Sequence, residues 1–231
     1  ALLPPATGVP GAASSAVSVP TDDNGKPLYD PAVLNDGRLR VLYYYGRSGS
    51  STTILCGSTP LHQSARSENV SLVEDSATGA ADYWLRSWSD HTGRGGRRTA
   101  LYDKTGTEVM TFEGEQNATL QNGLLVLQES RLIDGGYVPE SGYGTCQVID
   151  LATGAALPVP EGAYSCTVCG DKLVFSCYAR PEGLDDYDWD TDYQQNRWVV
   201  VQEKDGTPVY RADAASAYRL FYDSDTLSDW V

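Results

Sequence analysis

A short passage that recurs along the chain limits its fold more than any other feature of the sequence. The passage is an apolar strand, a tight turn and a second strand, and its copies have turn glycines at Gly57, Gly106, Gly154 and Gly206. A further copy of the turn lies near the amino terminus, at Gly25. The glycines are spaced by roughly 50 residues, a period typical of stacked repeat units such as propeller blades.

A second repeated passage lies between these hairpins. In it, an apolar strand crosses a short polar turn into a strongly apolar strand, as at residues 35–37 and at Asn122 and Gly123. Asn, Asp and Gly tolerate the positive φ angles of tight hairpins. Each repeat is therefore predicted to contain four antiparallel strands, here called A, B, C and D in chain order. The predicted units are residues 32–66, 68–115, 117–162 and 163–214, with a lone D strand at residues 26–29 and a lone A strand from Ala217.

A four-stranded meander buries its faces only by packing against another sheet, so repeats of this length stack around an axis. The sequence thus predicts an all-β fold, a β-propeller domain over residues 21–231, preceded by a flexible tether over residues 1–20 that carries no charged residue. The stray strands leave two alternatives, a part of a longer propeller or four blades closed with a partial fifth. A curved stack or a pair of sandwiches is the alternative architecture.

The turn segments 103–106 and 150–154 place an aspartate shortly before a Thr-Gly pair. This hairpin resembles the blades of quinoprotein-like and tryptophan-glycine repeat propellers, and the resemblance covers nearly all of the chain after residue 20. It is a resemblance of architecture, because Phe112 and Val159 stand roughly where quinoprotein repeats have tryptophan. The resemblance implies a propeller fold and does not imply quinone binding.

Charge and composition narrow the classes of partner. The net charge of −14 gives a field that repels nucleic acid and anionic membrane surfaces. No apolar run is long enough to span a membrane. The Ala-, Pro- and Ser-rich tether is typical of segments that follow an export signal or a lipid-anchored cysteine. We therefore expect an extracytoplasmic protein, secreted or held at a bacterial cell envelope, with a lipid anchor upstream of the tether as one option.

The cysteines offer a weak metal motif. Cys166 and Cys169 form a CxxC pair, but His62 and His91 lie far away in the sequence and only Cys177 is near. A suitable strand register would place Cys166 and Cys177 opposite each other on adjacent strands. The alternative is that these cysteines are small apolar residues packed in a sheet.

The connections between the B and C strands, at residues 46–51, 89–98, 131–144 and 179–197, are longer and more individual than the other turns. Because a meander places these B-to-C connections on one side of the ring, we expect ligands to bind there. Aromatic rings and a guanidinium are the candidate contacts for a sugar or a peptide. The predicted ligand-binding residues are Trp88, Arg97, Tyr137, Tyr143, Tyr187, Trp189 and Tyr193. Aromatic residues on strands, namely Tyr43, Tyr44 and Trp84, are expected in the interior instead.

The last B-to-C connection is also the most acidic segment. Its aspartates alternate with aromatic residues, and hard cations such as calcium need several converging carboxylates. The candidate calcium ligands are Asp186, Asp188, Asp190 and Asp192. The segment lacks the glycine and glutamate that complete an EF-hand, so a solvated acidic loop is the alternative. No other cofactor is expected.

Neither His62 nor His91 stands in a recognisable triad or metal motif. We therefore expect a non-catalytic binding or scaffold protein whose ligand is a protein or a glycan. One alternative is the propeller portion of a glycan-cleaving enzyme or a peptidase. Another is a purely structural repeat protein of the cell envelope, and the fold alone does not decide among these.

Overall fold

The computed structural model describes residues 19–46, 49–64, 68–89, 96–129, 145–179 and 196–212. These residues form antiparallel strands and turns and contain no helix. Accordingly, the described part of the chain has no helix long and apolar enough to cross a membrane. The chain divides into two compact units, which are described separately. The first combines the residues up to Glu74 with Ala80–Glu113, and the second combines Asp75–Gly79 with the residues from Gly114 onward.

The first sheet of the first unit has three strands, β1 (Leu39–Gly46), β2 (Gly49–Cys56) and β3 (Thr59–Gln63), in chain order. The prediction of an A strand at residues 32–34 is wrong, because this segment is a series of turns. Asp30 explains the difference: its carboxylate accepts a hydrogen bond from Ala32 N at 2.9 Å. Its carbonyl also accepts from Val33 N at 3.1 Å, and Pro31 between them fixes a turn conformation.

The predicted lone D strand at residues 26–29 is also absent. The Asp22 carboxylate accepts hydrogen bonds from the backbone nitrogens of Asn24 and Lys26, each at 2.9 Å. This closed turn leaves a single bridge, between Thr21 and Pro27, in place of a strand. The predicted trailing A strand from Ala217 lies outside the described residues.

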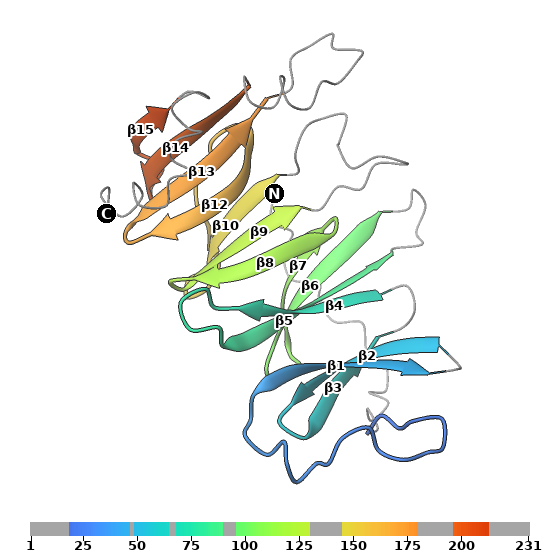
Figure 1. Ribbon diagram of the computed structural model, residues 1–231. Helices are drawn as coiled ribbons and strands as arrows, with labels where there is room; N and C mark the ends of the chain where they lie inside the picture. Colours follow the sequence, from blue (N-terminus) through green and yellow to red (C-terminus); the bar gives the residue numbers. More distant parts are fainter. Residues whose placement is uncertain are drawn as a thin grey trace, which may run out of the picture. The chain divides into compact units, whose positions relative to one another are not determined.

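The second sheet of the first unit is a complete four-stranded meander (Figure 1). Its strands are β4 (Glu68–Glu74), β5 (Ala81–Ser89), β6 (Arg97–Asp103) and β7 (Glu108–Glu113). Its apolar side packs on the first sheet through a core that includes Leu39, Ile54 and Trp84.

The second unit contains two further sheets of four strands each. One consists of β8 (Gln116–Gln121), β9 (Leu124–Glu129), β10 (Cys146–Asp150) and β11 (Ala155–Ala156). The other, orange to red in Figure 1, consists of β12 (Ala163–Cys169), β13 (Lys172–Tyr178), β14 (Arg197–Glu203) and β15 (Pro208–Ala212). The all-β fold of antiparallel, propeller-like blades is therefore confirmed.

The repeat glycines occupy the turns that the sequence predicts. Gly57, Gly106, Gly154 and Gly206 have φ angles between +57° and +90°, a region that side chains other than glycine rarely adopt. Asn122 shares this conformation, with φ +50°, in the hairpin between β8 and β9. The glycines that recur along the sequence therefore mark turns with the same kind of backbone conformation.

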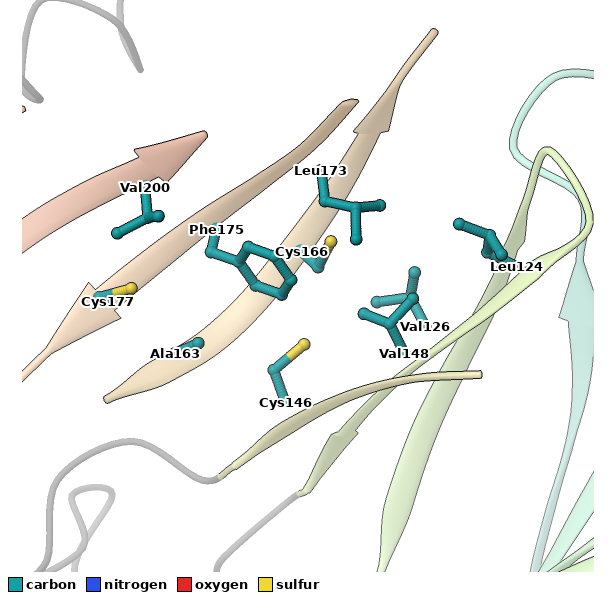
Figure 2. Packing of buried hydrophobic residues seen from close by; sticks show 10 residues of the cluster. All are labelled: Leu124, Val126, Cys146, Val148, Ala163, Cys166, Leu173, Phe175, Cys177 and Val200. Atoms are coloured by element: carbon teal, nitrogen blue, oxygen red, sulfur yellow. The ribbon is translucent and has the colours of Figure 1, made fainter. Parts of the chain in front are cut away.

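The core of the second unit joins its two sheets (Figure 2). Leu173 and Phe175 of β13 are fully buried and pack in one cluster with Val126 and Val148 of the neighbouring sheet. Cys146, Cys166 and Cys177 belong to the same cluster as free thiols. Their place in the core agrees with the alternative in which cysteines serve as packing residues.

The strand register is not the one that would place Cys166 and Cys177 opposite each other. Cys166 lies opposite Phe175, and Cys177 lies opposite Ala163, with a register shift between Ala163 and Ser165. The turn sets this register, because it pairs Cys169 with Lys172, and Cys166 then falls opposite Phe175, two residues short of Cys177.

The aromatic residues expected in the interior divide between core and surface. Trp84 is 2% exposed, as predicted, whereas Tyr44 is only half-buried and Tyr43 is 60% exposed. The reason is the length of β3, whose pairing with β2 ends at Thr53. Tyr43 lies opposite Thr52, beyond that end, so it leaves the packed part of the sheet.

Candidate functional site

Polar and aromatic side chains from four strands meet inside the first unit, where its two sheets pack. Residues two apart on a strand share a face, which places Trp84, Arg86 and Trp88 of β5 on one side. Tyr102 of β6 lies directly opposite Trp84, and Glu68 of β4 lies opposite Trp88. His62 reaches this group from β3 of the other sheet. We call these residues the His62 cluster: His62, Glu68, Trp84, Arg86, Trp88 and Tyr102.

Glu68 is the centre of the hydrogen bonds in the His62 cluster. His62 Nε2 lies 2.9 Å from Glu68 Oε2, so the ring N–H donates to the carboxylate in the Nε2 tautomer. The Arg86 guanidinium donates to the other oxygen, Glu68 Oε1. Both carboxylate oxygens are therefore engaged, and the Glu68 side chain is only 10% exposed. Arg86 supplies the positive charge that keeps this buried carboxylate ionised.

Stacked rings support this network on one side. The His62 ring stacks on Trp84 with centroids 5.5 Å apart, and Trp84 stacks on Tyr102 at 4.3 Å. The Arg86 guanidinium lies 4.9 Å from the centre of the Trp88 ring, within the range of a cation–π contact. Indole Nε1 of Trp84 donates to the Asp103 carbonyl at 3.1 Å, which satisfies its polar atom. The cluster is thus rigidly packed.

Burial sets the protonation of the cluster. It lowers the pKa of His62, and Arg86 acts in the same direction, although Glu68 alone would raise the pKa. Burial also raises the pKa of Tyr102, which donates a hydrogen bond to Glu108 at 3.3 Å. At neutral pH the cluster therefore contains a neutral imidazole and a neutral phenol around one carboxylate–guanidinium pair. The hydrogen bond from His62 of β3 to Glu68 of β4 thus joins the two sheets of the first unit.

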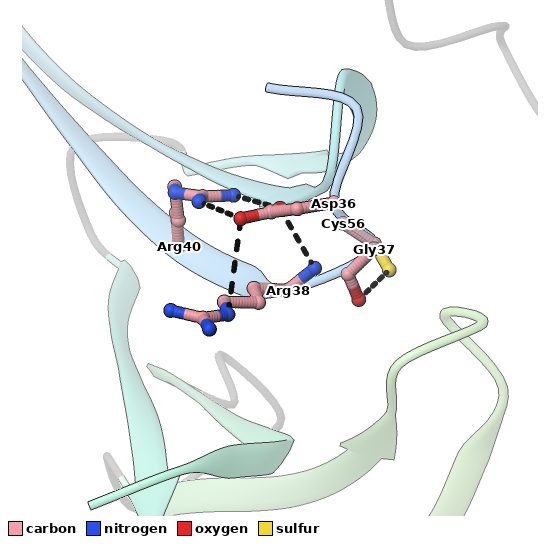
Figure 3. A network of polar contacts seen from close by, with 5 residues as sticks. All are labelled: Asp36, Gly37, Arg38, Arg40 and Cys56. Carbon is pink, nitrogen blue, oxygen red and sulfur yellow. Dashed lines mark hydrogen bonds and ion pairs between the residues drawn. The ribbon is translucent and has the colours of Figure 1, made fainter. Parts of the chain in front are cut away.

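A second polar network anchors the start of β1 (Figure 3). Arg40 binds the Asp36 carboxylate through both guanidinium nitrogens, with Nη1 at 2.7 Å from Oδ1. The backbone nitrogen of Arg38 donates to Asp36 Oδ1 at 3.2 Å. These hydrogen bonds, that of Arg40 first, hold the pKa of Asp36 well below its usual range. Because the network lies at the surface, we infer that it holds the turn before β1 rather than binding a ligand.

Of the predicted ligand-binding residues, the structure describes Trp88 and Arg97. They stand near the ends of β5 and β6, on either side of the connection 90–96. Trp88 pairs with Arg98, whereas Arg97 pairs with Ser89, so Trp88 and Arg97 fall on opposite faces of the sheet. The other predicted residues lie outside the described residues: Tyr137, Tyr143, Tyr187, Trp189 and Tyr193.

The candidate calcium ligands Asp186, Asp188, Asp190 and Asp192 also lie outside the described residues. Within the described ranges, no three His, Cys, Asp or Glu side chains are grouped as a metal site. Cys166 is buried and Cys169 half-buried, and no third ligand joins this CxxC pair there.

Sequence reasoning missed the His62 cluster. His62 and Glu68 are six residues apart but belong to different sheets, on either side of the junction between two repeats. Arg86 is the available signal, since a charged residue between Trp84 and Trp88 on a buried face needs a partner. The identity of that partner depends on how two sheets pack, which no local pattern encodes.

No protein-family model matches the chain, and no curated protein sequence matches it. Among solved structures, one described as "Crystal structure of the eukaryotic initiation factor" is similar with a TM-score of 0.39 and 9% sequence identity. The match covers 78% of this chain and 52% of that structure, so the chain spans about half of its length. A TM-score and an identity this low support no inference about function.

Proposed function

We propose that the chain is a non-catalytic binding or scaffold module that holds a protein or glycan with its B-to-C connections. The observation that carries this proposal is an asymmetry of the described sheets. Their A-to-B and C-to-D turns are tight, such as the glycine turns at Gly106, Gly123 and Gly206, apart from a longer one at residues 75–80, whereas three of the four B-to-C connections are long. Rigid sheets that support long connections at one end are a common design for recognition. The long connections are residues 90–96, 130–145 and 179–196.

The composition of the B-to-C connections supports the binding of a ligand. Two of them contain aromatic rings, which suit sugar rings and peptides: Tyr137 and Tyr143 in one, and Tyr187, Trp189 and Tyr193 in the other.

The proposal includes an extracytoplasmic location and blades of the quinoprotein-like or tryptophan-glycine repeat type. The uncharged tether supports the location, and the Asp, Thr and Gly residues of the hairpin at 103–106 support the blade type. Asp103 accepts hydrogen bonds from Thr105 N at 2.8 Å and Thr107 N at 3.0 Å. These contacts explain why the repeat retains an aspartate before its glycine.

Glycan binding is tested with a glycan panel and thermal unfolding. A ligand that binds only the folded protein raises the unfolding midpoint. For a glycan that gives such a rise, we expect Trp189→Ala to weaken the binding affinity by roughly tenfold or more, because aromatic anchors dominate such contacts. Tyr210→Ala is the matched control, since Tyr210 is an exposed aromatic residue on β15, outside the B-to-C connections. Equal losses in both variants, or no rise with any glycan, would contradict a glycan ligand at these connections.

A further inference from the structure

His62 is one of two histidines in the chain, and it lies between the two sheets of the first unit. Its side chain is 21% exposed, and its ring is held by Trp84 on one face and by Glu68 at Nε2. Histidine is the side chain whose charge changes between pH 5 and 8. A histidine placed at a contact between two sheets therefore makes that contact sensitive to pH in this range.

The groups around His62 come from every strand that packs on it. Its own sheet contributes Ile54, directly opposite on β2, and Val41 beyond it on β1, neither of which titrates. Cys56 of β2 is a further residue of this core, with a thiol side chain. Among the described residues, the other sheet contributes the charged groups near His62 and one phenol. These are Glu68 of β4, Arg86 of β5 and Tyr102 of β6, with Arg98, Glu108 and Glu113 further along the same face.

We propose that the His62 cluster is a pH-responsive contact between the first two sheets, which is strongest with neutral His62 and weakens when His62 gains a proton. This inference is independent of the proposed ligand. It rests on the hydrogen bond to Glu68, on the stacking against Trp84 and on the position of Arg86, which shares the same carboxylate.

The physical reason is first the burial of the His62 ring, which removes the hydration that a charged imidazole needs, and second the positive charge of Arg86. Protonated His62 would sit beside Arg86, with one carboxylate between two cations and most of its own hydration removed. The attraction to Glu68 opposes this cost but does not overcome it, and the pKa of His62 lies below its ordinary value of 6.5.

The sign of the pH dependence follows from linkage. The unfolded chain protonates His62 near pH 6.5, whereas the folded chain does so only at lower pH. The stabilisation by neutral His62 is therefore complete above pH 6.5, and it is lost as the pH falls from 6.5 through the pKa of the folded state. Acidification below neutral pH should thus weaken the contact between the sheets.

A proton NMR titration tests this directly, because the chain has only two histidines to resolve. His62→Phe, which preserves an aromatic ring against Trp84, identifies the His62 resonance by its loss. We expect that resonance to titrate below pH 6.5 in the folded protein. Titration at or above pH 6.5 would overturn the proposal.

Thermal unfolding at pH 7.5 and pH 5.5 tests the consequence for stability. The unfolding midpoint of the native sequence should fall with acidification by on the order of 3 °C more than that of His62→Phe. His91→Gln is the matched control, and its midpoint should fall as much as that of the native sequence. Equal falls in the native protein and in His62→Phe would overturn the proposal.

Glu68→Gln gives a second measurement that does not depend on the folding of His62→Phe, because His91→Gln leaves only the His62 resonance and so assigns it. This change removes the one group that raises the pKa of His62, so the His62 resonance should titrate at still lower pH. A purely structural role of Glu68 predicts lower stability with an unchanged titration of His62. An unchanged titration would therefore overturn the electrostatic coupling on which the proposal depends.

Discussion

Gly162, in the turn that leads into β12, combines an unusual backbone conformation with a close approach of two other strands. Its φ is +73°, and a Cβ atom there would lie 2.7 Å from the carbonyl oxygen of Tyr178. It would also lie 3.1 Å from the Trp198 ring. Tyr178 is held in place by a hydrogen bond from its own nitrogen to the Gly162 carbonyl, at 2.9 Å. Neither the backbone oxygen nor the ring can yield without disturbing the sheet.

We predict that Gly162→Ala lowers the free energy of unfolding by about 3 kcal/mol, a large value for a single substitution. Gly79→Ala is the matched control, because Gly79 has a similar φ of +66° but nothing within 4 Å of the added carbon. It should cost only the conformational part, about 1 kcal/mol. Urea denaturation of both variants checks the difference, and equal losses would show that the close approach does not matter.

At the scale of elements, one side chain links the two sheets of the second unit. Gln121, at the end of β8, accepts a hydrogen bond from Val168 N of β12 at 2.7 Å. Its amide nitrogen donates to the Cys166 carbonyl at 3.4 Å and to Thr119 Oγ1 at 3.1 Å. β12 is the first strand of its sheet and forms its edge. The glutamine therefore satisfies backbone groups that β13 does not reach.

Replacement of Gln121 by leucine should lower the free energy of unfolding by roughly 1–3 kcal/mol, because the Val168 N–H loses its acceptor. Gln147→Leu is the control, since Gln147 is an exposed glutamine on β10 of the same sheet. Hydrogen exchange at the Val168 amide should become faster in Gln121→Leu alone. Unchanged exchange at this amide would mean that the bridge contributes nothing to the edge strand.

At the scale of the whole molecule, all five cysteines are free thiols with different exposure. Cys146, Cys166 and Cys177 are buried, whereas Cys56 and Cys169 are half-buried. Burial raises the pKa of Cys146 to about 12 and that of Cys177 to about 11. Burial shifts the pKa of Cys166 in the same direction. Because the thiolate is the reactive form, these three thiols are almost inert at pH 8.

Alkylation at pH 8 followed by mass spectrometry should label Cys56 and Cys169 first in the native protein. Cys146, Cys166 and Cys177 should react only as the second unit unfolds, and they should do so together because they share one core. All five should react in denaturant. Early labelling of Cys166 in the native state would contradict the burial described here.

The sequence by itself determined the features that neighbouring residues control. The spacing of Gly57, Gly106, Gly154 and Gly206 predicted the turns, since positive φ favours glycine whatever surrounds it. The apolar strands between them predicted an all-β chain of meander sheets, as observed. Local turn residues can also override an apolar pattern. Asp30 and Pro31 favour turns at residues 32–34, where the apolar residues predicted a strand, and both signals are present in the sequence.

Tertiary structure alone decided which distant side chains meet. The register of the hairpin between β12 and β13 placed Cys166 opposite Phe175 rather than Cys177, and alternation along β5 and β6 placed Trp88 and Arg97 on opposite faces. The packing of two sheets joined His62 to Glu68. Such contacts depend on strand register and on the distance between sheets, and a change of one residue in register reverses every side chain of a strand. Turns are therefore encoded by adjacent residues, whereas the site is a property of the assembled sheets.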